Sequence, residues 1–341
     1  MTPSTMRAAR YHPETNTCSI DKIPVPTIKK HEILVKIASA GLCHSDLMLF
    51  DGSIPATEPV VMGHEGVGFA EEIGTDVKGF KKGDRLGFLY IKDVCFECDG
   101  CLVHNLNCRL GTAKIQGFQT DGFFAEYAAV DSRNAIILPD NLPMETSAPY
   151  FCAGITAFHG VDSCQLKPGQ WIAVVGCGGL GQMGIRFAKA MGLKVVGIDI
   201  NDEVLKAATE SGVDIAVNSR TPDFENQIRD RTGGGADAAV VFSAAQAAYD
   251  SATKILRIGG ILMVIGLPPK PLQFSALDLM KKLYQIRSES TGPPQQMPRA
   301  LEFIAKHEIK PRVDTYKLDQ FHEMIDLMQS GKSKSRMAVV F

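Results

Sequence analysis

The sequence has almost no excess of charge of either sign. Its 36 lysines and arginines nearly balance 38 aspartates and glutamates, which gives a formal net charge of −2 at pH 7. A protein that binds nucleic acid or an anionic membrane surface through charge needs a concentration of basic residues. We therefore expect no nucleic-acid partner and no membrane partner.

Long apolar runs and targeting signals are also lacking. No stretch approaches the roughly 20 apolar residues that are needed to span a bilayer. Residues 1–10 have no apolar core ahead of a small-residue cleavage site, so we expect no secretory signal peptide. Hydrophobic residues make up 45% and charged residues 22% of the chain, as in ordinary globular proteins. These features predict a cytoplasmic protein.

Tryptophan is nearly absent, and the cysteines are odd in number. Trp171 is the single tryptophan, and the nine cysteines do not suit the even-numbered disulfide framework of a secreted protein. Six of the nine cysteines lie at plausible metal-binding positions, as described below. The remaining three are expected to be free thiols: Cys18, Cys164 and Cys177.

The chain is long enough to favour two domains over one. At 341 residues it exceeds the size at which a single core usually stops growing. From Met6 to about Leu138, short alternating or apolar runs are separated by Gly, Pro and Asp turns, which predicts a β-rich domain. The strands expected there are Ile33–Ala40, Gly66–Ile73, Phe123–Val130 and Ala135–Leu138.

After Pro168-Gly169 the pattern changes to apolar strands that alternate with helices. Leu180–Met191 is predicted to be a helix, and so is Asn201–Glu210, with Asn201 as its N-cap. Such alternation predicts an α/β domain with a doubly wound parallel sheet and helices on both faces. The expected strands are Trp171–Val175, Val195–Asp199, Ile215–Asn218, Ala238–Phe242, Ile261–Gly266 and Gln285–Arg287. The tail is predicted to add helices Pro298–His307 and Gln320–Ser330 and a strand, Met337–Phe341.

A glycine-rich loop opens the first helix of the alternating region. Gly176-Cys177-Gly178-Gly179-Leu180-Gly181 follows the apolar strand Ile172–Val175, which is the context that a dinucleotide-binding loop requires. Glycines allow the tight turn and the close approach of a pyrophosphate to the helix N-terminus. The next strand ends in Asp199, whose carboxylate would accept hydrogen bonds from ribose hydroxyls and repel a 2′-phosphate. We therefore expect NAD rather than NADP.

A second group of residues suggests a catalytic metal site. His64 lies in Gly63-His64-Glu65, and Cys43 and Cys152 lie before and after it in the chain. Two thiolates and one imidazole suit zinc, and three protein ligands leave a fourth position open for water or substrate. Each residue alone is more simply a buried thiol or a core histidine, and Cys152 is the least certain of the three from first principles.

Four further cysteines have the spacing of a closed zinc site. Cys95-x2-Cys98-x2-Cys101-x6-Cys108 is compact enough for tetrahedral coordination. A zinc ribbon that binds nucleic acid is an alternative, but Asp93, Glu97 and Asp99 surround the cysteines and no basic stripe flanks them. His104 lies inside the last spacing and is expected to be a surface residue.

These motifs together resemble one enzyme family over essentially the whole chain. The pattern Gly63-His64-Glu65-x2-Gly68-x5-Gly74-x2-Val77 is the signature of zinc-dependent alcohol dehydrogenases of the medium-chain dehydrogenase/reductase superfamily, and the chain is most similar to the yeast and bacterial, often tetrameric, type. The resemblance implies a GroES-like catalytic domain with a structural-zinc lobe (residues 1–152), a Rossmann NAD-binding domain (153–290) and a C-terminal segment that returns to the catalytic domain (291–341). It also implies a homo-oligomer, either a dimer or a tetramer.

The resemblance assigns roles to individual residues. It implies two zinc ions per subunit, one catalytic and held by Cys43, His64 and Cys152, and one structural and held by the cysteine quartet. Glu65 would coordinate the catalytic zinc transiently, and Asp46 would fix the tautomer of His64. The cofactor would be bound by the glycine loop residues Gly176, Gly178, Gly179, Leu180 and Gly181, and by His44, Thr156, Asp199, Lys206, Leu267 and Arg336. Arg336 matches the family's phosphate-binding arginine less fully, because Ser335 precedes it where the family usually has glycine.

The activity that the resemblance implies is the interconversion of alcohols and aldehydes or ketones by hydride transfer to and from NAD. Ser45 would take the hydroxyl proton and pass it outward through the cofactor ribose. Many relatives end this relay at a histidine, where this chain has Met48, so we expect slower or more pH-dependent alcohol oxidation here. The cysteine quartet also departs from the family, with six residues instead of seven between its last two cysteines.

The substrate pocket is expected to be less aromatic than in relatives specialised for ethanol. Ile54 stands where those relatives have a tryptophan, Tyr90 lies near the place of another, and Phe50 is expected at the entrance, beside Ser45. This composition favours primary alcohols larger than ethanol. The alternative is another medium-chain reductase, of the cinnamyl or secondary-alcohol type, with a specialised carbonyl substrate.

Overall fold

The computed structural model describes residues 2–333 and 335–341, so Lys334, in the segment that leads to Arg336, lies outside the described residues. The chain divides into two compact units. The first consists of Met1–Ala153, Gly292–Lys306 and Pro311–Phe341, and the second of Gly154–Thr291 and His307–Lys310.

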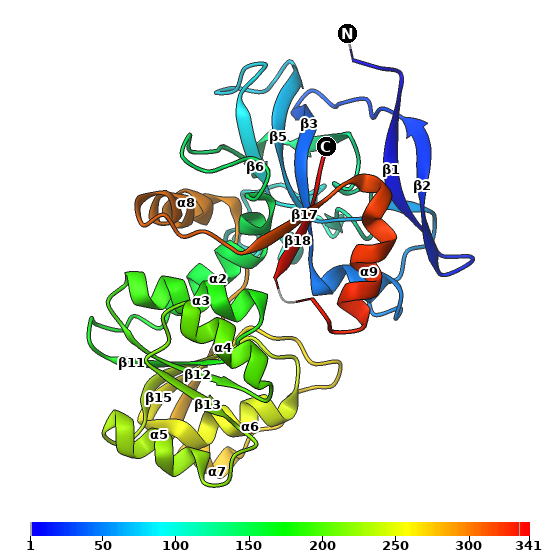
Figure 1. Cartoon of the computed structure of the whole chain (residues 1–341). Helices are drawn as coiled ribbons and strands as arrows, with labels where there is room; N and C mark the ends of the chain where they lie inside the picture. The colour runs from blue at the N-terminus through cyan, green and yellow to red at the C-terminus, as the bar shows by residue number, and fades with distance from the viewer. Residues whose placement is uncertain (1, 334) are drawn as a thin grey trace. The chain divides into compact units, whose positions relative to one another are not determined.

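The first unit is built on antiparallel β-structure (Figure 1). A seven-stranded sheet has the order β10-β6-β5-β3-β18-β17, with β9 also paired to β3, and a smaller sheet has the order β2-β1-β4. The strands are β1 (Thr5–His12), β2 (Thr17–Pro24), β3 (Glu32–Leu42), β4 (Val60–Val61), β5 (Glu65–Ile73), β6 (Arg85–Phe88), β7 (Ile91–Lys92), β8 (Lys114–Ile115), β9 (Tyr127–Asp131), β10 (Ala135–Ile137), β17 (Val313–Tyr316) and β18 (Arg336–Val340). The helices are α1 (Asp99–Val103), α8 (Met297–Lys306) and α9 (Phe321–Gln329).

The core of the first unit lies between the two sheets and α9. Ile33, Val35 and Ile37 alternate along β3 and are buried together with Phe124 and Phe321. The predicted strand Phe123–Val130 is shorter in the structure. Its first residues leave the sheet register, because the backbone N–H groups of Phe123 and Phe124 donate to the carbonyls of Gly63 and Met62, each at 3.0 Å.

The second unit is a doubly wound parallel sheet, as the alternation of strands and helices predicted. Its order is β13-β12-β11-β14-β15-β16, and all of its pairings are parallel. The strands are β11 (Trp171–Val175), β12 (Lys194–Asp199), β13 (Ile215–Asn218), β14 (Ala236–Val241), β15 (Leu256–Val264) and β16 (Tyr284–Ser288). The helices are α2 (Ala153–Asp162), α3 (Gly179–Ala190), α4 (Asp202–Glu210), α5 (Phe224–Thr232), α6 (Gln246–Ile255) and α7 (Ala276–Met280).

Local sequence explains the parallel sheet. Strands β11 and β14 are apolar at almost every position and are buried, as expected for strands covered on both faces. Helices α3 and α4 cover one face, and α5 and α6 cover the other (Figure 1). Helix α4 begins after Asn201, whose side chain accepts a hydrogen bond from the Glu203 N–H at 2.9 Å, which confirms the predicted N-cap. The sheet thus places the glycine loop and Asp199 at the carboxyl ends of neighbouring strands.

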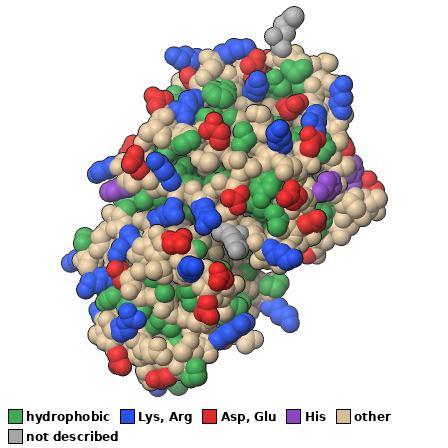
Figure 2. Space-filling view, viewed as in Figure 1, with side chains coloured by type: hydrophobic (Ala, Val, Ile, Leu, Met, Phe, Trp, Pro, Cys, Tyr) green, Lys and Arg blue, Asp and Glu red, His purple; other side chains and the backbone are tan. Residues whose placement is uncertain are grey.

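Two surface properties bear on partners. Basic and acidic side chains are interspersed over the face drawn in Figure 2, in keeping with the balanced composition. Within residues 2–333 and 335–341, no helix has both the length and the apolar character that crossing a membrane requires.

Candidate metal and nucleotide sites

The first candidate metal site lies at the end of β3 and the start of β5, where the seven-stranded sheet brings distant residues together. Ligand atoms of Cys43, His64, Glu65 and Cys152 all lie within 4.8 Å of one another. His64 and Glu65 are 2% and 0% exposed, so this is an interior cluster rather than a surface group of polar residues. The residues predicted for the catalytic zinc are therefore neighbours in the fold, although 109 positions separate Cys43 from Cys152.

Asp46 orients two members of this cluster. Its Oδ1 lies 2.9 Å from His64 Nδ1, and its Oδ2 accepts a hydrogen bond from the Cys43 N–H at 2.8 Å. A buried carboxylate at Nδ1 fixes the tautomer that leaves His64 Nε2 free to bind a metal ion. One side chain thus holds both the imidazole ring and the backbone of the first cysteine.

The electrostatics of the cluster favour bound thiolate. A hydrogen bond between the sulfurs lowers the pKa of Cys43 well below its usual value and raises the pKa of Cys152. Burial opposes a charge on the His64 ring, but Asp46 and Cys43 together outweigh burial, so the pKa of His64 is raised. A site that already stabilises thiolate and lies beside a carboxylate suits a divalent cation.

Glu65 provides a direct test of whether a metal ion fits. Its carboxylate is ion-paired with Arg336, which is 9% exposed, through Oε1. Its other oxygen, Oε2, is buried and has no hydrogen-bond partner among the described residues. An unpartnered buried carboxylate oxygen costs free energy unless something satisfies it. Because Glu65 belongs to the cluster of ligand atoms, a metal ion held by Cys43, His64 and Cys152 fits this site.

Two aromatic rings pack against the His64 imidazole. The Tyr90 ring packs edge-on against His64 at 5.0 Å between centroids, and the Phe118 ring lies at 5.3 Å. Phe118 is a residue that the sequence reasoning missed. The position of Phe118 in the sequence, after the cysteine quartet, does not indicate a contact with His64, because only the fold brings the two rings together.

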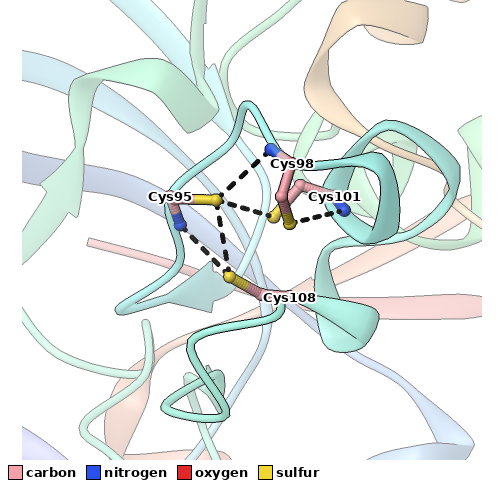
Figure 3. Close-up of side chains that lie close together, drawn as sticks. All are labelled: Cys95, Cys98, Cys101 and Cys108. Carbon is pink, nitrogen blue, oxygen red and sulfur yellow. Dashed lines mark hydrogen bonds between the residues drawn. The ribbon is translucent and has the colours of Figure 1, made fainter.

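The second candidate metal site is the cysteine quartet, shown in Figure 3. The Sγ atoms of Cys95, Cys98, Cys101 and Cys108 lie within 4.8 Å of one another, and Cys95 Sγ is 3.7 Å from Cys108 Sγ and 3.8 Å from Cys101 Sγ. Backbone N–H groups also point at the sulfurs, including that of Arg109 at 3.4 Å from Cys98 Sγ. This hydrogen bond, together with those from the Cys101 N–H and the neighbouring thiols, lowers the pKa of Cys98 to about 6.

The shortened spacing does not prevent closure of the quartet. The six residues between Cys101 and Cys108 hold a 3₁₀ turn, Asn105–Asn107, that returns the chain to Cys95. Asn105 is buried within the turn, and His104 is half-buried and accepts a hydrogen bond from the Leu106 N–H through Nδ1 at 3.2 Å. Four converging sulfurs with N–H···S bonds form a closed, structural type of metal site.

The nucleotide-type loop lies in the second unit. Gly176 has a φ of 87°, which disfavours any residue with a side chain, and a Cβ on Gly181 would lie 3.0 Å from the carbonyl carbon of Gly176. The Asp199 carboxylate is anchored beside this loop by three backbone N–H groups, those of Cys177 at 2.8 Å, Ile200 at 2.8 Å and Asn201 at 3.0 Å. The loop and the carboxylate are therefore held in one place.

Comparison with known proteins decides the family. Residues 29–140 match the alcohol dehydrogenase GroES-like domain, and residues 179–306 match the zinc-binding dehydrogenase family. An alcohol dehydrogenase of Geobacillus stearothermophilus is 34% identical over 336 residues, covering 98% of this chain and 99% of that protein. The chain belongs to the zinc-dependent alcohol dehydrogenases of the medium-chain dehydrogenase/reductase superfamily.

Solved structures of this superfamily have the same fold. The alcohol dehydrogenase of Aeropyrum pernix superposes with a TM-score of 0.88 at 28% identity, over 98% of this chain and 100% of that one. The acetophenone reductase of Geotrichum candidum, solved in complex with NAD, superposes with a TM-score of 0.89 at 24% identity, over 100% of this chain and 98% of that one. This alcohol dehydrogenase therefore has the predicted fold class, a GroES-like domain joined to a Rossmann domain.

The remaining predicted site residues are distributed over both units. In the first unit, His44 is exposed and Ser45 is half-buried, with its Oγ 3.8 Å from Cys43 Sγ. In the second unit, Thr156 is half-buried on α2, Lys206 is exposed on α4, and Leu267, beyond β15, is 78% exposed. The assignment of these residues to cofactor contacts stays a prediction.

The residues predicted for the substrate pocket occupy different surroundings. Ile54 is half-buried against the core of the first unit, and so is Tyr90, which also contacts His64. The Phe50 ring packs edge-on against Tyr11 of β1 at 5.2 Å between centroids. Tyr90 is thus the member of the three whose ring borders the metal cluster, and Phe118 joins it there.

Proposed function

We propose that this chain is an NAD-dependent oxidoreductase that interconverts alcohols and aldehydes or ketones, with primary alcohols larger than ethanol as its preferred substrates. The observation that carries the proposal is the buried cluster of Cys43, His64, Glu65 and Cys152. The Ser45 hydroxyl lies beside this cluster. Family membership and the NAD bound to the acetophenone reductase of the same fold support the choice of reaction and cofactor.

The chemistry divides between the bound groups and the protein. Zinc held by Cys43, His64 and Cys152 would supply the Lewis acidity that makes an alcohol hydroxyl acidic near neutral pH, and NAD would accept the hydride. The Ser45 Oγ would take the hydroxyl proton, and its distance of 3.8 Å from the Cys43 sulfur supports this role. Asp46 keeps the His64 ring in the metal-binding tautomer, and the Tyr90 and Phe118 rings exclude water from its side.

The proposed preference for larger alcohols follows from a substrate pocket with fewer aromatic residues than that of relatives specialised for ethanol. Ile54 stands where relatives specialised for ethanol have a tryptophan, so longer chains would gain apolar contact without a steric penalty. A buried methylene is worth about 0.8 kcal/mol, which corresponds to about a fourfold gain in binding. The four extra methylenes of 1-hexanol should raise kcat/KM over that of ethanol by a factor on the order of 100.

A graded panel of alcohols tests this proposal. Reduced nicotinamide is followed by its near-ultraviolet absorbance with NAD and ethanol, 1-butanol, 1-hexanol and benzyl alcohol, before and after treatment with a zinc chelator. We expect turnover that the chelator abolishes and that rises with chain length. Turnover that survives complete zinc removal would contradict the reaction class, and a preference for ethanol would contradict the substrate class alone.

Met48 offers a second test of the mechanism. It is half-buried in the 3₁₀ helix His44–Leu49, and its thioether cannot carry a proton away from Ser45. Replacing Met48 with histidine should raise the rate of alcohol oxidation near neutral pH severalfold, because an imidazole relays protons in this range. The pH profile of kcat is the measurement, with Met48→Leu as the control for packing. An unchanged profile in Met48→His would show that the relay does not pass this position.

We also infer that the enzyme is a homo-oligomer, a dimer or a tetramer. Strand β16 ends the strand order of the parallel sheet, and an unprotected edge strand can pair with a second copy. Several large apolar side chains near this edge are exposed, namely Ile258, Leu277, Met280, Leu283 and Ile286. Sedimentation equilibrium should therefore give a mass of two or four times 36.9 kDa. No disulfide joins the nine cysteines, all of which lie among the described residues, and this supports a reducing compartment, so we place the enzyme in the cytoplasm.

A further inference from the structure

The Glu65–Arg336 ion pair spans three strands of the seven-stranded sheet. Glu65 is the first residue of β5 and Arg336 the first residue of β18, and β3 lies between these two strands. Neighbouring strands are about 4.8 Å apart, so the two backbones are separated by roughly twice that distance. The carboxylate and the guanidinium can meet only above the middle strand.

Gly41 is the residue of β3 over which they meet. In the strand register Gly41 lies directly opposite Glu65 on one side and Ala338 on the other. Arg336 is two residues from Ala338, so it faces the same side of the sheet. A Cβ at position 41 would lie 3.2 Å from Glu65 Cβ and 3.3 Å from Cδ, and closer still to Oε2. Any side chain at this position would occupy the place of the carboxylate.

Glycine in the interior of a strand is otherwise unfavourable. It costs conformational entropy and contributes no side chain to the sheet. Gly41 is not among the glycines whose φ lies in the left-handed region, so backbone conformation does not require glycine here. The close approach of the Glu65 side chain is therefore the physical reason for glycine at this position.

We propose that Gly41 is a positioning residue of the metal centre, which acts through Glu65. The space above Gly41 lets the carboxylate keep Oε1 on Arg336 while the side chain stays in the cluster with Cys43, His64 and Cys152. A methyl group at position 41 displaces Oε2, so the carboxylate no longer supports the bound metal ion. The inference rests on the proposed function in one respect, the presence of zinc at this cluster.

Zinc release tests the inference without reference to activity. The purified, zinc-loaded protein is mixed with an excess of a chromophoric chelator, and the release phase that Cys43→Ala lacks is assigned to this site. Loss of a residue that supports a ligand set typically weakens metal binding by about 10- to 100-fold. We therefore expect Gly41→Ala to release this zinc at least about tenfold faster than the wild type.

A double variant distinguishes positioning from general packing. Glu65→Asp withdraws the carboxylate by one methylene and makes room for a methyl group at position 41. Gly41→Ala should therefore add nothing to the release rate of Glu65→Asp. Gly66→Ala is the matched control, because its methyl group would meet the rings of Phe88 and Phe123 on the other face of the sheet. Its effect should persist in the Glu65→Asp background.

Each outcome bears on the inference. A wild-type release rate in Gly41→Ala would overturn it while leaving the proposed function in place, and so would an equal acceleration by Gly41→Ala in the Glu65→Asp and wild-type backgrounds. A wild type with no Cys43-dependent zinc would overturn both. If Gly41→Ala does not fold, circular dichroism should show that the Gly41→Ala/Glu65→Asp variant recovers a folded protein. Failure to recover, with Glu65→Asp itself folded, would also overturn the inference.

Discussion

Replacing Cys43 with alanine should lower the rate of alcohol oxidation by at least about 10³-fold and remove one zinc ion per chain. Cys43 is tied to the rest of the cluster through Asp46, which holds both its backbone and the His64 ring. Loss of this thiolate leaves one sulfur and one imidazole, which is too small a ligand set to retain zinc. The lost Lewis acid contributes several kcal/mol of transition-state stabilisation, and each 1.36 kcal/mol is about tenfold in rate.

The measurement combines initial rates with the zinc content determined by atomic emission. Cys18→Ser is the matched control, because Cys18 is a half-buried thiol of the same unit that contacts only His322 among its described hydrogen-bond partners, at 3.5 Å. It should retain both zinc ions and full activity. A Cys43→Ala protein that keeps its activity after losing the zinc would show that the metal ion is not catalytic.

The cysteine quartet and the catalytic cluster differ in how much a sequence can predict. Cys95, Cys98, Cys101 and Cys108 lie within one short segment, so local chain geometry alone brings their sulfurs together. Cys43 and Cys152 meet only because the 3₁₀ helix Ala148–Phe151, which ends at Cys152, packs against β3 and β5 of the seven-stranded sheet. Spacing predicts the first site directly, whereas the second required recognition of the family pattern around His64.

The two domains show the same contrast. Strands β11 and β13 were predicted at their observed bounds, because each is a short, mainly apolar run between clear turns. The β-rich unit was less predictable, since β1 and β2 carry mixed polar and apolar residues and pair locally. Helices α5 and α6 also escaped prediction. Helix α5 is strongly polar, with Phe224 and Ile228 as its buried apolar positions.

Side-chain pairings across the sheet could not be predicted at all. The ion pair between Glu65 and Arg336 joins residues 271 positions apart, and the sequence reasoning had assigned these two residues to different roles. Those roles remain predictions, but the structure adds a constraint on both. A buried pair of this kind is costly to break, because removing one partner leaves an uncompensated charge in the interior. Gly41, between the two, showed no signal in the sequence beyond its place two residues before Cys43.

Replacing Asp199 with asparagine should reverse the cofactor preference of the enzyme. The carboxylate is held by the N–H groups of Cys177, Ile200 and Asn201, so its orientation is fixed before the cofactor binds. Hydrogen bonds to a charged group contribute about 1.5–3 kcal/mol, so we expect kcat/KM for NAD to fall by about 10- to 100-fold. Removal of the negative charge also removes the repulsion of a 2′-phosphate, so kcat/KM for NADP should rise.

Steady-state rates with both cofactors at one alcohol concentration measure this change. The control is Asp202→Asn, since Asp202 is a neighbouring carboxylate at the start of α4 that accepts a hydrogen bond from Asn218 Nδ2 at 2.7 Å. This control removes the same charge three residues away and should leave the NAD-to-NADP ratio nearly unchanged. An unchanged ratio in Asp199→Asn would mean that another group selects the cofactor. Equal shifts in both variants would instead indicate a general electrostatic effect, because only Asp199 is anchored to the glycine loop itself.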